Sequence, residues 1–217
     1  MRVMRLDHLS YAAGPEGLAE CVQRLGARLG AGFRDGGIHP SFGTRNFVLP
    51  LAEGCYLEIV GVLDHPAVDR APFGRAVRDR SADGGGWLAW VVAVDDISPI
   101  EQRLARPSAP GHRRRPDGVD LRWSQIGVND VAADPQLPFF VQWHSPVSEH
   151  PSAGGSTVSL DKLEIAGDEK AIDDYLGTSA TQPLDGVDVE WLDPIDYYGT
   201  GVVAAVFETS SGPVRID

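Results

Sequence analysis

Two short apolar segments each carry one side chain that could bind a metal ion. Residues 6–11 read LDHLSY, with His8 near the middle, and residues 56–60 read YLEIV, with Glu58 at the centre. Alternate residues of a strand share a face, so we expect His8 to point away from Asp7 and Leu9. If both strands lie in one curved sheet, an imidazole and a carboxylate meet in a cavity. This pair could begin a divalent-metal site.

Each of these two residues also has a purely structural interpretation. His8 could be a hydrogen-bonded histidine near the surface of a sheet. Burying Glu58 costs free energy unless a cation, a metal ion or hydrogen bonds compensate, and pairing with Arg45 across a hairpin would supply such compensation. The joint placement of His8 and Glu58 favours the functional interpretation.

Further polar candidates lie in similar settings. Gln142 interrupts the apolar run 138–143 (PFFVQW) and is a candidate third metal ligand, although an amide binds divalent ions weakly and is often only a hydrogen-bonded polar group. His144, two residues later, is a reserve ligand. His39, in a Gly-Gly-Ile-His-Pro turn, could act as a proton shuttle at the cavity mouth or be an ordinary loop histidine. Asn46 is expected to bind the backbone or a ligand carbonyl.

The remaining aromatic, basic and sulfur-containing residues are best interpreted as core residues or as solvent-exposed residues. Trp90 and Trp143 are expected to pack in the core or to wall an apolar ligand pocket. The run 113–115 (RRR), in a turn-rich stretch, is expected to be solvated, although it could help to hold an acidic ligand. Three other histidines, His65, His112 and His150, are expected on surface loops. Neither cysteine, Cys21 or Cys55, is expected to be a nucleophile.

The hydrophobic pattern predicts an α+β fold built from repeated units of one strand, one helix and three strands. The first two units span residues 1–63 and 86–145, and together they form a domain over 1–145. A third, partial unit spans 157–217 and begins with a phrase, LDKLEIAG, that echoes LDHLSYAAG at the start of the chain. In this third unit Lys162 occupies the position of His8, so the unit offers no metal ligands. We expect it to pack against the first pair or against a second subunit in a homodimer.

The repeated βαβββ unit, with LDHLSY, GIHPSFGTRN, YLEIV and PFFVQW as its matching phrases, resembles the vicinal oxygen chelate superfamily and, within it, the glyoxalase-like domain proteins. The resemblance implies a half-open curved sheet around a cavity, with metal ligands on the first and last strands of each unit. Carried over by position, the ligands are His8, Glu58 and Gln142, and the ion is zinc, nickel, manganese or iron. The fourth position falls on Ala89, which cannot bind a metal.

The composition and charge of the chain indicate which classes of binding partner and which cellular location to expect. The net charge of −12 disfavours nucleic acid and anionic membranes as partners, since both would repel the chain. No apolar run is long enough for a membrane helix, two cysteines are too few for a disulfide framework, and residues 1–5 lead directly into a strand pattern. These features predict a cytoplasmic protein with a small-molecule ligand.

Two functions of different classes follow. The first is a divalent-metal-assisted enzyme, of isomerase, lyase or dioxygenase type, acting on a small oxygenated organic molecule, with Glu58 doubling as a base and His39 moving protons. The second is a non-catalytic small-molecule binding or sequestration protein that uses the same cavity, which Ala89 and Gln142 at ligand positions favour. A scaffold that has lost its site is a third, weaker interpretation.

Overall fold

The structure is a computed structural model that describes residues 4–217. Its first part contains one strand, one helix and three further strands: β1 (Met4–Ala12), α1 (Leu18–Leu29), β2 (Arg34–His39), β3 (Thr44–Pro50) and β4 (Tyr56–Val62), with a 3₁₀ turn at Ala52–Gly54. Helix α1 buries Cys21, Leu25 and Leu29 and ends at Gly30, whose left-handed backbone (φ 61°) costs glycine little.

Helices α2 (Ala67–Arg70) and α3 (Pro72–Ala82) lead to a second part with the same order of elements. These are β5 (Gly86–Val94), α4 (Ser98–Leu104), β6 (Ala109–Arg114), β7 (Asp120–Ile126) and β8 (Phe139–Trp143). The turn-rich stretch expected around Arg113 is therefore partly a strand. Strands β6 and β7 pair antiparallel around a Pro-Asp-Gly turn at 116–118, a sequence that suits a hairpin.

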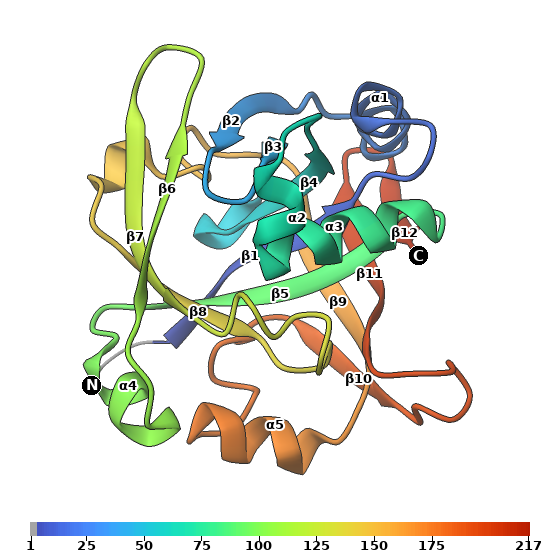
Figure 1. The fold of residues 1–217 in the computed structure, drawn as a ribbon. Helices are drawn as coiled ribbons and strands as arrows, with labels where there is room; N and C mark the ends of the chain where they lie inside the picture. The colour runs from blue at the N-terminus through green and yellow to red at the C-terminus, as the bar shows by residue number, and fades with distance from the viewer. Residues whose placement is uncertain (1–3) are drawn as a thin grey trace.

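The eight strands β1 to β8 form one closed barrel in the order β1-β4-β3-β2-β6-β7-β8-β5 (Figure 1). In each half the first strand runs parallel to the last, β1 beside β4 and β5 beside β8. The halves meet between β1 and β5, and again at the pair Ile38–Arg114 between β2 and β6. The sequence predicted a half-open sheet. The β2–β6 contact closes it, because it joins two strands that would otherwise be open edges.

The C-terminal part forms a separate four-stranded sheet. After a 3₁₀ turn at Val147–Glu149 it contains β9 (Ser159–Ala166), α5 (Glu169–Leu176), β10 (Asp188–Leu192), β11 (Gly201–Thr209) and β12 (Gly212–Ile216). The order of elements resembles that of a barrel half, but the sheet order is β10-β9-β11-β12, so the first strand pairs with the second and third strands rather than the last. This part is not a copy of a barrel half.

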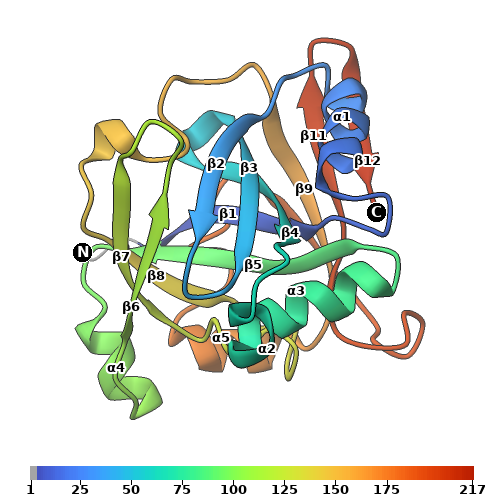
Figure 2. The ribbon, with the colours of Figure 1, turned by 45° about the horizontal axis from the view of Figure 1, so that its top comes forward.

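The four-stranded sheet packs against the barrel. Residues of β1, β5, β9 and β11 share one hydrophobic core, and the indole of Trp87 donates a hydrogen bond to the backbone oxygen of Ile216 at 3.1 Å. Helix α1 lies beside β11 and β12 (Figures 1 and 2), and Arg28 bonds to the backbone oxygen of Arg215. The expected packing of the third unit on the first pair is therefore observed; the homodimer stays a prediction.

Strand β5 is buried on both faces, as its continuous apolar run predicts. Ala89, Val91 and Ala93 belong to the core inside the barrel, whereas Trp90 and Val92 belong to the core shared with the C-terminal sheet. Trp90 is fully buried there and donates to the backbone oxygen of Gln136 at 2.8 Å. Its proposed role in binding substrate is thus corrected: it faces away from the interior of the barrel.

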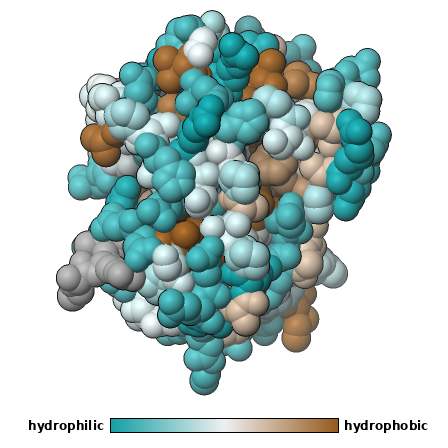
Figure 3. Space-filling view, turned by 60° about the vertical axis from the view of Figure 1, so that its left-hand side comes forward, coloured by the Kyte–Doolittle hydropathy of each residue, from teal (hydrophilic) through white to brown (hydrophobic). Residues whose placement is uncertain are grey.

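One face of the molecule is largely polar. On the face shown in Figure 3, hydrophilic residues cover much of the surface and apolar residues lie in separate groups among them. Within residues 4–217, no helix is long and apolar enough to cross a membrane.

Candidate active site

Three of the polar residues singled out in the sequence, His8, His39 and Glu58, meet in a cavity inside the barrel. Its polar lining consists of His8, His39, Tyr56, Glu58, Arg113 and Gln125. Its apolar lining consists of Phe42, Phe73, Trp123, Val128, Phe139, Val141 and Trp143. The free volume is about 30 Å³, enough for roughly one water molecule. The cavity is therefore narrow and mostly apolar, with a few charged groups.

A β-bulge brings Asp7 and His8 together. In the β1–β5 register Leu6 pairs with Val92 and His8 pairs with Val91, so Asp7 is an extra residue in β1. A bulge changes the direction of side chains and interrupts the alternation of a strand. The expectation that His8 points away from Asp7 is therefore wrong: Nδ1 of His8 lies 2.8 Å from Oδ2 of Asp7. This contact assigns the Nδ1 proton to the bond with Asp7 and turns Nε2 toward the cavity.

Asp7 is a buried carboxylate with three donors around it. Besides His8, it accepts hydrogen bonds from Nε1 of Trp143 at 2.9 Å and from Nε2 of His150 at 3.1 Å. Burial alone would raise its pKa, but the bonds from His150 and His8 outweigh burial and hold the pKa of Asp7 well below its usual range. His150, expected on a surface loop, is instead largely buried against the site.

Glu58 faces His8 from the neighbouring strand. Strand β4 runs parallel to β1 with Glu58 opposite Ser10, and Oε2 of Glu58 lies 3.8 Å from Nε2 of His8. The Ser10 hydroxyl donates to Oε2 and the Asn46 amide donates to Oε1. Burial raises the pKa of Glu58, but the nearby His8 and these two hydrogen bonds together lower it below its ordinary value. Glu58 is therefore an ionised carboxylate beside an imidazole.

Arg45 and Asn46 differ from their expected roles. Arg45 pairs with Asp35 rather than with Glu58, which removes the structural alternative proposed for Glu58. Asn46 is fully buried behind Glu58 and does not line the cavity, so it positions the carboxylate instead of contacting a ligand. A Cβ atom on Gly36 would overlap the Asn46 side chain, so glycine at this position makes room for it.

His39 lines the cavity as a neutral group. Its Nδ1 lies 3.2 Å from the Thr44 hydroxyl, and burial lowers its pKa to about 3. A proton shuttle works best with a pKa near the working pH. The environment of His39 therefore suits a hydrogen-bonding role better than the proton transfer expected from the sequence.

Gln142 lies on the opposite face of β8 from the cavity. Its side-chain oxygen accepts from the backbone N–H of Ile97 and its amide donates to the backbone oxygen of Asp95, both at 3.1 Å. Val141 and Trp143 point inward instead. The assignment of Gln142 as a ligand is corrected, because one step along a strand reverses the face. His144, the reserve ligand, is exposed and contacts the Ser124 hydroxyl.

The residues present do not complete a metal site. Among residues 4–217, no group of three or more His, Cys, Asp or Glu side chains is arranged to hold a metal ion. Both oxygens of Glu58 accept hydrogen bonds, and His8 offers one nitrogen, whereas fixed zinc sites use three or four protein ligands. The Arg113 guanidinium in the same cavity would also repel a cation. His39 lines the same cavity, but within residues 4–217 it does not complete a metal site with His8 and Glu58.

Several residues of this site were missed by sequence reasoning. Asp7 was hidden by the bulge, and His150 is brought in from a distant loop. Arg113 was placed in a solvated run, yet it is only 2% exposed. The Pro-Asp-Gly turn that follows could have identified its segment as a strand with one inward face.

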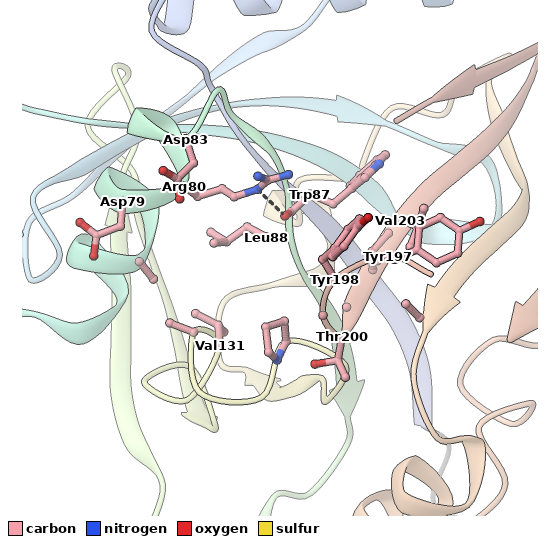
Figure 4. A pocket seen from close by; sticks show the side chains of 17 residues that line it. Asp79, Arg80, Asp83, Trp87, Leu88, Val131, Tyr197, Tyr198, Thr200 and Val203 are labelled. Atoms are coloured by element: carbon pink, nitrogen blue, oxygen red, sulfur yellow. Dashed lines mark hydrogen bonds between the residues drawn. The ribbon is translucent and has the colours of Figure 1, made fainter. Parts of the chain in front are cut away.

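A much larger pocket lies outside the barrel but carries none of the candidate residues. It has a volume of about 490 Å³ and lies between α3, β5 and the loop before β11 (Figure 4). Arg80 at its wall donates to the backbone oxygen of Trp87, and Tyr197 and Tyr198 come from the facing loop. The clustered acid–base groups are in the smaller cavity, which is therefore the candidate active site.

Comparison with known proteins identifies the family. A sequence profile described as "Glyoxalase-like domain" matches residues 6–175. A hypothetical protein from Staphylococcus aureus shares the fold with a TM-score of 0.68 at 11% identity, covering 99% of each chain. Methylmalonyl-CoA epimerase from Mycobacterium tuberculosis aligns with a TM-score of 0.43 at 15% identity over 65% of this chain and 89% of its own.

The corresponding enzyme from Streptomyces coelicolor, in complex with 2-nitronate-propionyl-CoA, aligns with a TM-score of 0.43 at 15% identity, covering 65% of this chain and 96% of its own. A search of curated proteins found no match to this sequence. The profile spans well over half of the chain, including both halves of the barrel. The chain belongs to the glyoxalase-like domain family.

Proposed function

We propose that this protein is a proton-transfer enzyme of isomerase or lyase type, acting on a small oxygenated organic molecule in the barrel cavity. The observation that carries the proposal is the Asp7–His8–Glu58 cluster. An ionised, hydrogen-bonded carboxylate faces an imidazole across 3.8 Å, and a buried carboxylate holds the far side of that imidazole at 2.8 Å.

The cluster assigns a role to each group. Glu58 accepts a proton from a substrate carbon next to a carbonyl, since its charge is maintained by hydrogen bonds from Ser10 and Asn46. His8 enters the step with a proton on each nitrogen: Asp7 holds the Nδ1 proton, and Nε2 gives its proton to the substrate carbonyl oxygen as Glu58 takes the carbon proton, which yields a neutral enol. In the second half of the step Nε2 takes the oxygen proton back and Glu58 returns its proton to carbon. The two atoms together let a proton leave one substrate atom and return to another, as isomerisation and elimination require.

The cluster favours some reaction types over others. Oxygen activation by a dioxygenase of the non-haem iron type uses three ligands, two histidines and a carboxylate, on one face of the metal. The cavity is lined by His8, His39 and Glu58, but among residues 4–217 no three such side chains are arranged to hold a metal ion. Of the predicted reaction classes, isomerase and lyase chemistry is thus the better supported.

Deuterium exchange tests the proposal. The protein is incubated in D₂O with 2-oxobutanoate and with its neutral counterpart butanone, and loss of the proton signal next to the carbonyl is followed by NMR. We expect exchange above the buffer rate for at least one compound, and Glu58→Gln should slow it by about 10²- to 10⁴-fold.

The matched control is Glu164→Gln, which removes a carboxylate paired with Arg215 in the C-terminal sheet, and should leave exchange unchanged. Exchange that is equally fast in Glu58→Gln would contradict the proposed base.

A second function is favoured by the walls of the cavity. Trp123, Phe139 and Trp143 give it the largely apolar lining of a small-molecule binding pocket. Binding of carbonyl compounds without exchange, in both the native protein and Glu58→Gln, would identify a binding or sequestration protein.

A further inference from the structure

Arg113 is buried without a counter-charge. It is 2% exposed, and its Nε–H has no hydrogen-bond acceptor. Within residues 4–217, no carboxylate forms an ion pair with it. The adjacent Arg114 is exposed, and Arg115 pairs with Asp117 and Glu149. Leaving a charged group unpaired in the interior is costly, so a buried guanidinium that faces a cavity indicates an anion that binds there.

The position of Arg113 relates it directly to the acid–base cluster. In the barrel order, β6 is the fourth strand from β1 in either direction, so Arg113 projects from the wall opposite His8. It also lines an outer pocket of about 440 Å³, together with His150 and Arg34. Arg113 therefore lies between the outer pocket and the cavity that contains Glu58.

The charges and walls of the cavity restrict the class of anion. Asp7 and Glu58 are both held as anions at the opposite wall. A single guanidinium matches one carboxylate through two parallel hydrogen bonds, whereas a phosphate dianion would meet two fixed negative charges with one cation. The remaining lining is mainly aromatic, with Trp123 on the strand next to β6.

We infer that Arg113 binds the carboxylate of the ligand, and that the ligand is an organic monocarboxylate with a compact apolar body. The free volume of the cavity is about 30 Å³, so its side chains must move apart to admit the ligand. The apolar body then lies against Trp123 and Phe139, and the carbon that reacts faces Glu58. Only the position of the reacting carbon rests on the proposed function; the carboxylate site stands on the burial of Arg113.

Binding of phenylacetate and of its neutral counterpart phenylacetamide tests this inference by calorimetry. The native protein should bind phenylacetate at least about tenfold more tightly than phenylacetamide, since a hydrogen-bonded charge pair is worth that much or more. Arg113→Met should weaken phenylacetate binding by about 10- to 100-fold and leave phenylacetamide binding unchanged. Arg114→Met, which removes the exposed neighbour, is the matched control and should bind both compounds as the native protein does.

Equal affinity of the native protein for the two compounds, or retention of the preference in Arg113→Met, would overturn the inference. Inorganic phosphate binding that depends on Arg113 would overturn the assignment to a monocarboxylate. In the absence of ligand, Arg113→Met should raise the melting temperature, because it removes an unpaired buried charge. Loss of a residue with a purely structural role would not raise the melting temperature.

If Arg113→Met does not fold, Arg113→Lys supplies the comparison, because it keeps the charge and loses the paired donors; its preference for phenylacetate should fall but persist. Glu58→Gln separates the two proposals. If Glu58→Gln loses deuterium exchange but still binds phenylacetate, both the proposed reaction and the carboxylate site are supported. If the native protein binds carboxylates through Arg113 but catalyses no exchange, only the proposed reaction is refuted.

Discussion

The two halves of the barrel have the same strand pairing but carry different chemistry. Strand β4 places Glu58 in the cavity, whereas its counterpart β8 places Val141 there. Strand β2 supplies the neutral His39, and its counterpart β6 supplies the charged Arg113. Strand β1 contributes His8, while the inward positions of β5 are alanine and valine. The proposed proton-transfer groups thus occupy one half, and the proposed anion-binding group and the apolar walls occupy the other.

This asymmetry explains why the cavity does not form a symmetric metal site. Ligands from both halves would converge on a central ion, but the second half offers no inward ligand at the positions that correspond to His8 and Glu58. A ligand that spans the cavity instead meets an acid–base wall on one side and Arg113 on the other. Substitutions in the two halves should therefore have different effects, which the following variants test.

The largest effect in the first half is expected from Asp7→Asn. The amide keeps the shape of the side chain but can present its NH₂ group to His8, which destabilises the tautomer with a proton on Nδ1. Asp7 is a positioning residue, and its loss should slow deuterium exchange by about 100-fold or more. Removing one member of a buried charged cluster should also cost about 3–5 kcal/mol of unfolding free energy.

The pH dependence separates this role from simple destabilisation. The folded-state pKa of Asp7 is depressed, so its stabilising contribution is present above its ordinary pKa of 3.8 and is lost as the pH falls below that value. Denaturant unfolding of native protein and Asp7→Asn should therefore differ most near neutral pH and converge in acid. A constant difference at every pH, with an unchanged exchange rate, would show that the Asp7 charge has no role.

His39 provides a second test in the same half. Burial lowers its pKa from 6.5 to about 3, so the unfolded chain takes up a proton near pH 6.5 while the folded protein does not. Stability should fall as the pH falls from about 6.5 to 3, by up to about 1.4 kcal/mol per pH unit. His39→Gln should flatten this slope in denaturant unfolding. His144→Gln, on the outer face, should retain it; a native-like slope in His39→Gln would contradict a buried neutral imidazole.

Sequence periodicity was sufficient to pair His8 with Glu58. Each residue interrupts an apolar strand, and the parallel register of β1 and β4 brings the two side chains to one wall. The same reasoning failed at Asp7, because a bulge adds one residue without a signature in the hydrophobic pattern. It also failed at Gln142, where a shift of one position exchanges the inward and outward faces.

Long-range contacts were less accessible to prediction. His150 is separated from Asp7 by 143 positions, and its loop carries no periodic pattern that would specify where it folds back. Closure of the barrel depends on the contact between Ile38 and Arg114, in two strands with weak hydrophobic signals. The C-terminal sheet follows the predicted order of elements, but strand pairing depends on packing that the order alone does not determine.

The smallest effect is expected from Gln142→Ala in the second half. Gln142 makes two hydrogen bonds to the backbone of Asp95 and Ile97, each worth about 1 kcal/mol, so the variant should lose about 1–2 kcal/mol of unfolding free energy. Its deuterium exchange and its zinc content, measured after chelation, reloading and buffer exchange, should equal those of the native protein. The matched comparison is Glu58→Gln, which changes an inward residue of the corresponding strand and should slow exchange by about 10²- to 10⁴-fold. Stoichiometric zinc that is lost in both variants would instead restore Gln142 as a ligand and would mean that the two halves share one metal site. Zinc content unaffected by Gln142→Ala, with stability lowered, would confine Gln142 to holding the connection between β5 and α4 and leave the acid–base chemistry to the first half.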